Sequence, residues 1–517
     1  MIKVNFGDKR LRPMPVEAFR KLNKEELIVM LEHEHGMRVF LEGHVHLLQE
    51  KMFEFAGKYF RIQSKMFSPS SEKSPRSNIG RGKDKNPGDK ARAVKLPSER
   101  YPDADIIDKH ITCEHPPACS ACGSLMQDSG MTETSEYLTV IPKKYIVVRQ
   151  HRHKYCCGGC HGSVFTTPNI PRVIPGSSYS DELVVDATLS KYCDLIPMER
   201  YAQMAKRQGF AGLPPHSLIG ASLKLAEFFL AAYERLKKET LQTEVLLADE
   251  TPHRMLEGDD KTGWFLWGFS NEKSCFYECH DTRSGDVAST LLQNSSCEVL
   301  LTDVYSGYKK AVREANEIRV EKDVPLISMA YCNSHARRGF ISNELEAPAE
   351  SQFMIDRYKE IYRLEAEAKS QELLKVAKTR SKMLPIYEAM KQHVQIHENA
   401  FSTKSGIAKA FSYFLRNYDG LTFFLKNPKV PIDNNQSERL LRSHVIGRKT
   451  WYGTHSKDGA TAAAIHFSLI EACKLNHLNP RQYYADLIAR LHAKKAIVTP
   501  REFLERVEEK LKSADTS

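Results

Sequence analysis

Residues 245–252 read Val-Leu-Leu-Ala-Asp-Glu-Thr-Pro, and this stretch decides the fold class of the chain. Four apolar residues in succession predict a short strand buried within a sheet, and the run ends at Asp249. A second apolar run, residues 299–301, is followed after one threonine by Asp303. The two runs therefore predict buried strands that each end at a carboxylate.

The segments around these runs predict the rest of the sheet. Two further strands, a helix and a last strand are expected, in that order along the chain, at residues 263–269, 274–279, 285–293 and 325–331. Strand, strand, strand, helix, strand, helix, strand is the order of a ribonuclease H-like α/β fold. In that fold the first and fourth strands are neighbours at the sheet centre. We therefore expect Asp249 and Asp303 to lie side by side.

A third acidic residue, Glu438, stands in a polar stretch, Asp-Asn-Asn-Gln-Ser-Glu-Arg at residues 433–439, that reads as the start of a helix. Carboxylates at two strand ends and on one helix are the ligands that a two-metal phosphoryl-transfer site needs, with Mg²⁺ or Mn²⁺ as the two ions. Neighbouring carboxylates repel each other unless a cation lies between them. A single aspartate after a strand is usually a turn former, so the prediction depends on the set. The set makes the chain a candidate enzyme for cutting and joining DNA.

The 517 residues carry a formal net charge of +10, which fits a polyanionic partner such as DNA. Spread over this length, the charge is also compatible with a basic protein that has no such partner. Hydrophobic residues make up 41%, enough for several cores. Neither a membrane span nor a secretory segment is recognisable, so we expect a cytoplasmic protein whose 12 cysteines are reduced.

The N-terminal part predicts a helical arm and then a linker. Residues 25–66 are rich in helix formers, and Leu27, Leu41 and Leu48 share one heptad position. A dimerising coiled coil and an ordinary amphipathic helix are both compatible, because a glutamate and two glycines interrupt the pattern. Residues 68–100 are rich in Pro, Gly, Ser, Lys and Arg, which predicts a flexible basic linker. This linker either follows a DNA backbone or is a solvated tether.

Two Cys-x-x-Cys pairs predict a zinc ribbon, in which two knuckles supply four thiolates to one tetrahedral Zn²⁺. The four expected ligands are Cys119, Cys122, Cys157 and Cys160. Cys156 is the competitor, but only Cys157 keeps the two-residue spacing to Cys160. Strand-like segments at residues 136–141 and 145–148 would form the hairpin between the knuckles. A redox pair and free thiols are the alternatives.

A pair of helices is expected before the predicted sheet. Residues 198–208 read as a helix that ends at Gly209, and a long apolar helix follows from Pro214 or His216 towards Lys237. Two helices across a short glycine turn form either a DNA-reading helix–turn–helix or a hairpin that caps the next domain.

Six short phrases resemble, in the same order, those of the DDE transposases of the insertion-sequence-66 family, and together they span nearly the whole chain. They are residues 67–73, the paired cysteine knuckles, Asp-Glu-Thr-Pro at 249–252, Thr-Asp-x-Tyr-x-Gly-Tyr at 302–308, Cys-x-x-His-Ala-Arg-Arg-x-Phe at 332–340, and Asn-Asn-x-x-Glu-Arg at 434–439 followed by Gly-Arg-Lys at 447–449. The usual Phe-Gly pair of the family is Phe67-Ser68 here, outside the expected core.

This resemblance implies that Asp249, Asp303 and Glu438 are the catalytic triad of a transposase. Such an enzyme would cleave transposon ends and join their 3′-hydroxyls to target DNA without a covalent protein–DNA intermediate. Its partners would be end DNA, target DNA, further copies of the chain and small accessory proteins of the same element, in the nucleoid of a bacterial cell. A metal-dependent nuclease without joining activity and a catalytically inactive DNA-binding descendant are the alternatives.

Further residues in these phrases are candidates for the site. Cys332 and His335 follow the fifth strand as half of a zinc site; because the sequence offers no second half nearby, we expect them to support the edge of the active site. Six basic residues are expected to contact DNA phosphates, with surface ion pairs as the alternative: Arg337, Arg338, Arg439, Arg442, Arg448 and Lys449.

The interval between Asp303 and Glu438 is too long for the bare fold. Its helix-rich part is expected to be an insertion that either contacts end DNA or braces the helix of Glu438. The chain is then a multidomain α/β protein with an N-terminal arm (1–67), a linker (68–105), a zinc-binding module (106–170), a helical region (171–240), a catalytic core (241–345 and 428–475), a helical insertion (346–427) and a C-terminal helical tail (476–517).

Overall fold

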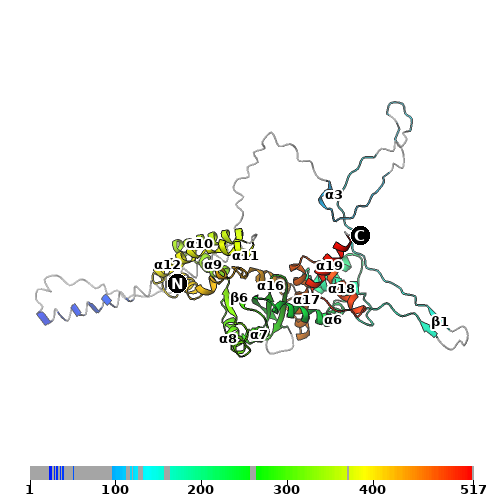
Figure 1. Ribbon diagram of the computed structural model, residues 1–517. Helices are drawn as coiled ribbons and strands as arrows, with labels where there is room; N and C mark the ends of the chain where they lie inside the picture. The colour runs from blue at the N-terminus through cyan, green and yellow to red at the C-terminus, as the bar shows by residue number, and fades with distance from the viewer. Residues whose placement is uncertain are drawn as a thin grey trace. The chain divides into compact units, whose positions relative to one another are not determined.

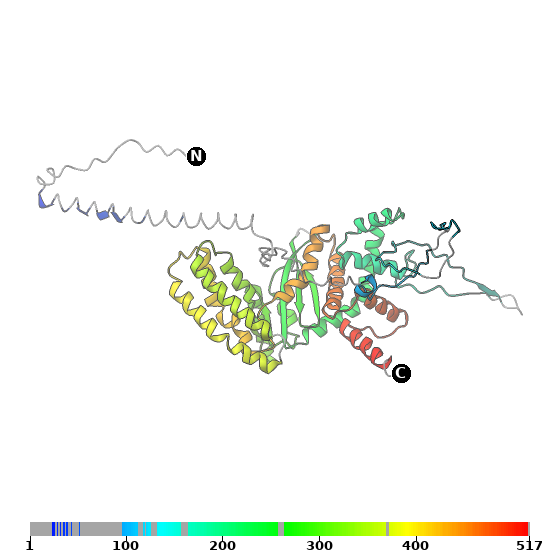
Figure 2. The same cartoon turned by 90° about the horizontal axis from the view of Figure 1, so that it is seen from above.

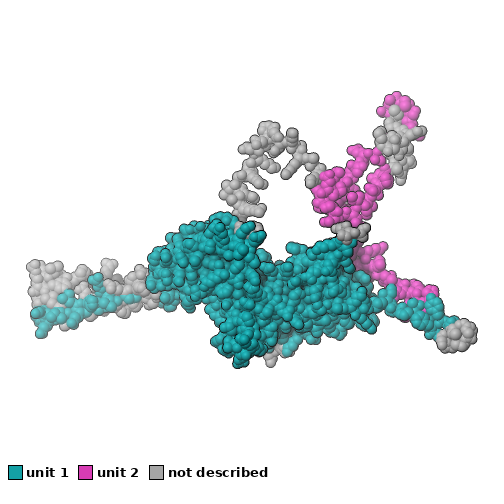
Figure 3. Space-filling view, viewed as in Figure 1, with its two compact units in different colours: residues 1–68, 154–202, 214–517 teal, residues 69–153, 203–213 magenta. Residues whose placement is uncertain are grey.

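A computed structural model describes residues 96–111, 117–125 apart from 119, 132–156, 164–256, 263–368 and 372–514, with single residues between 23 and 51. The chain divides into two compact units (Figure 3). The first comprises residues 1–68, 154–202 and 214–517, and the second comprises residues 69–153 and 203–213.

The centre of the first unit is a five-stranded mixed sheet in the order β5-β4-β3-β6-β7 (Figure 1). Its strands are β3 (Val245–Arg254), β4 (Gly263–Ser270), β5 (Cys275–His280), β6 (Val299–Thr302) and β7 (Ser328–Tyr331). β3, β4 and β5 are antiparallel neighbours, whereas β6 and β7 run parallel to β3. The five strands predicted for this sheet are confirmed, and so is the pairing of the first of these strands with the fourth.

The two faces of the sheet belong to different cores, because successive side chains of a strand point to opposite faces. Leu246 and Leu300 join the first core, whereas Leu247 and Leu301 join the second. This double burial explains why the strands read as continuous apolar runs.

Seven helices contribute buried side chains to the first core. They are α4 (Asp181–Tyr192), α6 (Pro215–Leu241), α7 (Asp286–Leu292), α8 (Ser306–Glu321), α16 (Asn435–Trp451), α17 (Lys457–Leu475) and α18 (Pro480–His492). The alanine-rich α17 is buried on nearly all sides and packs on β5 and α6. A last helix, α19 (Pro500–Ala514), follows. Among the described residues, no helix is long and apolar enough to span a bilayer.

Helices fill the long interval between β7 and α16, and all of them except α11 contribute to the second core. They are α9 (Asn333–Ile341), α10 (Pro348–Ala368), α11 (Leu373–Ser381), α12 (Leu384–His397), α13 (Gly406–Arg416), α14 (Tyr418–Leu421) and α15 (Phe423–Lys426). Figure 2 shows them in yellow and pale orange as a bundle beside the sheet. The helical nature of the predicted insertion is thus confirmed.

The helix pair before the sheet is also present. α5 (Met198–Arg207) ends ahead of Gly209, whose φ of +87° is a left-handed backbone that glycine adopts without strain. α6 then begins at Pro215, a residue type favoured in the first helical turn.

Two predicted strands are wrong. Residues 136–141 and 145–148 have no regular secondary structure, and a short hairpin of β1 (Lys154–Cys156) and β2 (Val164–Thr166) lies further along the chain. The apolar side chains of the first two segments stay in solvent; Val147 is 91% exposed. A short stretch of strand-forming residues alone does not make a strand, and among the described residues no neighbouring strand pairs with either segment.

Most of the N-terminal arm, and with it the coiled-coil prediction, lies outside the described residues. Apart from Asn23, the residues that are described there, such as Glu25 and Ile28, are helical. The basic linker is described only from Leu96 onward, where α3 (Pro97–Arg100) forms a single turn.

Candidate active site

The register between β3 and β6 brings two of the predicted carboxylates together. The parallel pairs run from Val245 opposite Val299 to Leu247 opposite Leu301. Continued by two residues, the same register sets Asp249 level with Asp303. Strand pairing therefore brings together two aspartates that are far apart in the sequence.

One expectation about this pair is corrected. Asp249 is not at the end of its strand, because β3 continues to Arg254 with β4 as its antiparallel partner. Asp249 lies instead where β3 extends beyond its parallel pairing with β6, opposite Gly268 of β4. At this residue β3 is paired with β4 on one side but no longer with β6 on the other. The backbone of Asp249 is therefore fixed on the β4 side, and its carboxylate lies beside the unpaired edge of β3.

The charge of Asp249 is poorly compensated. Burial raises the pKa of this carboxyl to about 8, and the neighbouring charges of Glu250, Asp303 and Glu438 act in the same direction. Only the backbone N–H of Glu250, 2.9 Å from Oδ1, acts against the shift. A carboxylate so placed favours either a proton or a cation, and oxygen donors of this kind suit Mg²⁺ or Mn²⁺.

The adjacent acid Glu250 has the opposite environment. Its carboxylate is only 2% exposed and accepts hydrogen bonds from Arg283 Nε at 2.9 Å and from the Tyr308 hydroxyl at 2.7 Å. The guanidinium of Arg283 also lies over the ring of Tyr305, 4.0 Å from its centroid. Glu250 is therefore a structural acid paired with Arg283, and it connects β3 with the segments that carry Arg283 and Tyr308.

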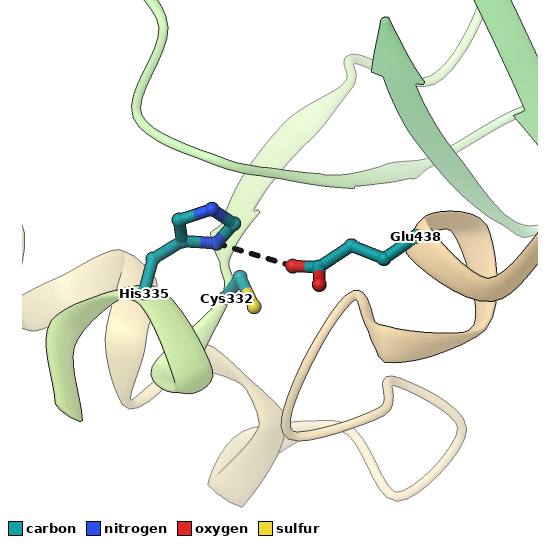
Figure 4. Close-up of side chains that lie close together, drawn as sticks. All are labelled: Cys332, His335 and Glu438. Carbon is teal, nitrogen blue, oxygen red and sulfur yellow. Dashed lines mark ion pairs between the residues drawn. The ribbon is translucent and has the colours of Figure 1, made fainter. Parts of the chain in front are cut away.

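Glu438 lies in the first turn of α16, as the polar stretch predicts. Arg338 Nη2 contacts both of its oxygens, at 3.0 Å and 2.7 Å, and His335 Nδ1 lies 3.6 Å from Oε1. Figure 4 shows Glu438 extended towards His335, with the sulfur of Cys332 beside them. Glu438 is near enough to Asp249 to raise the pKa of that carboxyl.

Among the described residues, Glu438 groups with Cys332 and His335 and not with the two aspartates. The ligand atoms of these three side chains all lie within 4.8 Å of one another. Cys332 is buried, which raises the pKa of its thiol to about 12, and its sulfur accepts the backbone N–H of Asn434 at 3.2 Å. The Cys-x-x-His pair thus lies at the edge of the site, and the carboxylate across from it is the predicted catalytic glutamate.

Several contacts fix the start of α16 against the sheet. Asn434, the buried residue before the helix, donates from Nδ2 to the carbonyl of Ala248 at 2.9 Å. Ser437 contacts Ser270 of β4 at 3.1 Å between their hydroxyl oxygens. A Cβ on Gly268 would come within 3.3 Å of Leu441 and 3.0 Å of Tyr277, so the absent side chain allows α16 to lie close to β4.

The loop that leads into α16 is held by a buried ion pair of the insertion. Arg380 and Glu365 are 4% and 5% exposed, and their closest atoms lie 2.6 Å apart. Arg380 Nη1 also lies within hydrogen-bond distance of four backbone carbonyls, that of Phe424 in α15 and those of Asn427, Pro428 and Val430 in the loop. The insertion therefore braces the approach to Glu438.

A second brace comes from Asn333 at the start of α9. Its Nδ2 donates to the carbonyls of Leu421 and Ile432, at 2.9 Å and 3.0 Å, and its Oδ1 accepts the Tyr387 hydroxyl at 2.8 Å. Neither Asn333 nor Arg380 stands out in the sequence, since polar residues inside helices carry no periodic signal.

Two buried histidines connect β3 with α16. His253 Nδ1 lies 3.1 Å from His444 Nε2, and His253 Nε2 lies 2.7 Å from the Thr454 hydroxyl. Burial, reinforced by the charge of Arg448, lowers the pKa of His253 to about 4; the same causes, together with His253, bring the pKa of His444 well below its usual range. Both rings are therefore neutral near pH 7.

The six candidate DNA-contacting residues divide by environment. Arg439, Arg442 and Lys449 are exposed on α16, whereas Arg448 is half-buried and its pKa is lowered by that burial. Arg338 is engaged with Glu438, and Arg337, half-buried on α9, has interactions of its own. Three of the six are thus exposed and can meet a polyanion directly.

The predicted zinc site cannot be followed in space. Cys119, Cys157 and Cys160 lie outside the described residues, while Cys122 and the competitor Cys156 are exposed.

Comparison with known proteins fits this picture. The model of the family described as "Transposase IS66 family" matches residues 176–462, and that of the "zinc-finger binding domain of transposase IS66" matches residues 116–161. Three relatives from Sinorhizobium fredii, each described as an uncharacterized protein, are 25%, 27% and 26% identical to the chain. The alignments cover 77%, 72% and 78% of this chain, and 74%, 74% and 76% of the respective relatives.

The two matching models together describe a transposase with a zinc-finger domain. More than half of the chain matches the family model, and the chain belongs to the IS66 transposase family. All four predicted zinc ligands fall within the residues that match the zinc-finger model.

Proposed function

We propose that the protein is a DNA transposase whose five-stranded sheet is a ribonuclease H-like catalytic core. In this proposal Asp249, Asp303 and Glu438 are the catalytic carboxylates, and the enzyme binds transposon ends, cleaves them and joins the 3′-hydroxyls to target DNA. The observation that carries the proposal is the register of β3 and β6, which sets Asp249 level with Asp303, together with the effect of Glu438 on the pKa of Asp249.

The donor set fits two divalent cations. Asp249 of β3 and Asp303, which directly follows β6, offer carboxylate oxygens, and the uncompensated charge at Asp249 favours a cation there. Two bound Mg²⁺ or Mn²⁺ ions would supply activation of a water or 3′-hydroxyl and stabilisation of the leaving oxygen. The chain's own contribution is orientation: β3 and β6 fix the two aspartates, Glu250 stays paired with Arg283, and α16 presents Glu438.

Arg338 has a positioning role in this proposal. Its guanidinium holds Glu438 through Nη2, at 2.7 Å from Oε2, so the glutamate has a defined place before the cations and DNA arrive. Guanidinium groups also bind phosphates bidentately, so a phosphate of the DNA would compete with Glu438 for Arg338. Exchange of these partners would release the glutamate towards the aspartates as the substrate enters.

The remaining basic residues are proposed to hold the DNA. Arg439, Arg442 and Lys449 project from the exposed side of α16, the helix that carries Glu438. Arg448 and Arg337 would contribute nearer the protein interior. Neutral substitution of any one of these side chains should weaken DNA binding and reduce its dependence on salt concentration.

We also propose roles for the other parts of the chain. Zn²⁺ held by Cys119, Cys122, Cys157 and Cys160 would order residues 106–170 for contact with end DNA. The helical region 171–240 would add a further DNA contact. The N-terminal arm would join copies of the chain, with accessory proteins of the element as further partners.

The test uses the full chain with labelled ends of its own element and Mg²⁺ or Mn²⁺. Glu438→Gln should abolish cleavage and also the joining of pre-cut ends, because both reactions use the same carboxylates. End binding should be largely retained, since the exposed arginines are untouched. Asp286→Asn, an exposed acid paired with Lys310, is the matched control and should stay within about twofold of wild type.

The outcomes separate the proposal from its rivals. Cleavage by the wild-type chain without joined product from pre-cut ends would indicate a nuclease. Binding without either reaction would indicate a DNA-binding protein. Undiminished joining by Glu438→Gln would refute the assignment of that residue.

A further inference from the structure

Glu438 and the Cys-x-x-His pair together form a group of possible metal ligands that the proposed function does not use as a group. Cys332 Sγ, a ring nitrogen of His335 and a carboxylate oxygen of Glu438 all lie within 4.8 Å of one another (Figure 4). Cys332 is the residue before α9, and His335 lies in the first turn of that helix, while Glu438 comes from α16. The spacing along α9 sets the first two on one side of a helix start, and the third comes from the opposite wall.

The chemistry of these donors differs from that of the aspartate pair. Thiolate, imidazole and carboxylate are the ligands of Zn²⁺, which accepts three protein groups and keeps a fourth position open. Mg²⁺ and Mn²⁺ prefer oxygen and discriminate against sulfur. One protein region therefore offers a hard-cation site at Asp249 and Asp303 and a soft-cation site next to it.

A second observation points to a missing partner. His335 Nδ1 is buried and has no hydrogen-bond partner within the part of the chain that the structure describes; Glu438 Oε1 is its nearest acidic atom, at 3.6 Å. That distance exceeds a normal hydrogen bond but matches the separation of two ligands around a tetrahedral ion. A buried polar atom without a partner is costly, and a cation between the two atoms would satisfy both.

We propose that Cys332, His335 and Glu438 bind a soft divalent cation such as Zn²⁺, and that this cation inhibits the enzyme by holding Glu438 away from the aspartate pair. The binding site stands on the geometry alone, whereas the inhibitory effect rests on the proposed catalytic function of Glu438.

Inhibition follows from where the carboxylate of Glu438 would be fixed. Arg338 Nη2 contacts Oε2 at 2.7 Å, and the cation would take Oε1, the oxygen 3.6 Å from His335 Nδ1. Held by both partners on the side of α9, Glu438 would not turn towards Asp249 and Asp303. The hydrogen bond from Arg338 would fix the bound carboxylate, as outer partners of metal ligands commonly do.

Binding exchanges one proton for the cation. The thiol of Cys332 becomes a thiolate bonded to the ion, and its proton leaves to solvent. Coordination through Nδ1 puts the ring proton of His335 on Nε2, so the 3.4 Å contact of that atom with Arg338 Nη1 opens. No oxidant or reductant takes part, and removal of the cation restores the starting state.

The test for the site is the zinc content of the purified full chain, dialysed in excess Mg²⁺ so that the aspartate pair is blocked. Wild type should hold about two zinc ions per chain, one in the zinc finger and one in this cluster. Cys332→Ser and His335→Gln should each hold one fewer, whereas Cys279→Ser, a half-buried thiol of β5, should match wild type. Equal zinc content in all four proteins overturns the site.

Folding and function are monitored in the same proteins. A double Cys119→Ser and Cys122→Ser variant, loaded with Co²⁺, should keep the visible absorption of a tetrahedral site with one thiolate, and the spectrum should vanish when Cys332→Ser is added. Absence of the spectrum in the finger variant alone also overturns the site. Thermal unfolding of each protein distinguishes removal of a ligand from disruption of the fold.

The inhibitory role is tested by adding Zn²⁺ to the cleavage reaction in Mg²⁺ and expressing the rate of each protein relative to its own zinc-free rate. Wild type and Cys279→Ser should slow by about tenfold or more, comparable to the effects of disturbed metal ligation, and recover when a chelator is added. His335→Gln should not slow. If His335→Gln holds one zinc ion fewer but is still inhibited by Zn²⁺, the binding site stands and its inhibitory role is overturned. A chain without cleavage activity would contradict the proposed function but leave the zinc count interpretable.

Discussion

The two aspartates and Glu438 reach the same region by different physical means. Asp249 lies on β3 and Asp303 directly follows β6, and the pairing and double-sided burial of these two strands fix the distance between the aspartates. Glu438 arrives after a long helical insertion; Asn434 holds the start of its helix, and side chains of Asn333 and Arg380 hold the loop before it. Backbone pairing in a sheet leaves few alternatives, whereas a helix end held by side chains can shift. The aspartate pair should therefore be robust, and Glu438 should be the adjustable member.

Asp303→Asn alters the aspartate pair and should have the largest effect on activity. Cleavage and joining should fall by at least the order of 10²–10³-fold, because a charge that acts on the transition state is lost. The metal-free protein should not be destabilised, since the substitution removes repulsion that raises the pKa of Asp249. Single-turnover cleavage and thermal unfolding measure the two effects; a strong drop in melting temperature would attribute the loss to misfolding instead.

Arg380→Met removes the side chain that holds the loop before Glu438. The substitution leaves Glu365 buried without its partner and removes donors to four backbone carbonyls, so stability should fall by about 3–5 kcal/mol. Denaturant unfolding measures this loss.

The double variant Arg380→Met with Glu365→Met separates stability from positioning. It should recover much of the stability, because two apolar side chains replace a buried ion pair, but not the activity, because the loop before Glu438 stays unbraced. Full activity in the double variant would show that the brace serves folding alone.

Gly268→Ala sharpens the comparison at the point where α16 meets the sheet. The new methyl group would press on Leu441 and Tyr277, at a cost of about 1–3 kcal/mol, and displace α16 while Asp249 and Asp303 keep their register. Cleavage should decline more than the affinity for end DNA. Gly220→Ala in α6, which meets nothing within 4 Å, is the control and should be neutral or stabilising. Equal effects of the two substitutions on activity would argue against close packing at Gly268.

Acid should loosen the contact between β3 and α16. His253 titrates at about pH 4 in the folded chain and His444 well below its usual range, while both return to an ordinary pKa of about 6.5 on unfolding. The unfolded state then binds more protons between those values. Stability should therefore be full above about pH 6.5 and decline towards pH 4, by about 1.4 kcal/mol per pH unit for each histidine.

His444→Gln should flatten this part of the pH profile, and His216→Gln on the exposed side of α6 should leave it unchanged. Denaturant unfolding at several pH values provides the measurement. An equally steep profile in His444→Gln would show that other groups cause the acid sensitivity.

The sequence predicts the rigid half well because its information is local. Apolar runs identify β3 and β6, and their order along the chain predicts that they pair. The extension of β3 past Asp249 has no such signal, because it depends on pairing with β4, from Arg254 opposite Gly263 inward, and not on apolar residues. In the segment at residues 145–148 the same local pattern misleads, since an apolar run is present but no strand pairs with it among the described residues.

The adjustable half depends on contacts that the sequence does not announce. Arg380 and Glu365 look like ordinary charges of a helical insertion, yet both are buried. Asn333 and Asn434 belong to recognisable phrases, but their carbonyl partners are distant in sequence and unremarkable in type. The environment of Glu438 beside Cys332 and His335 emerges only when α9 and α16 are brought together.

Diffraction from crystals of the full chain with end DNA and Mn²⁺, recorded for the anomalous signal of manganese, tests the central claim most directly. The account predicts manganese between Asp249 and Asp303, with Glu438 turned from Arg338 to contact a bound ion. Manganese elsewhere, or an aspartate pair without manganese while DNA is bound, would contradict it.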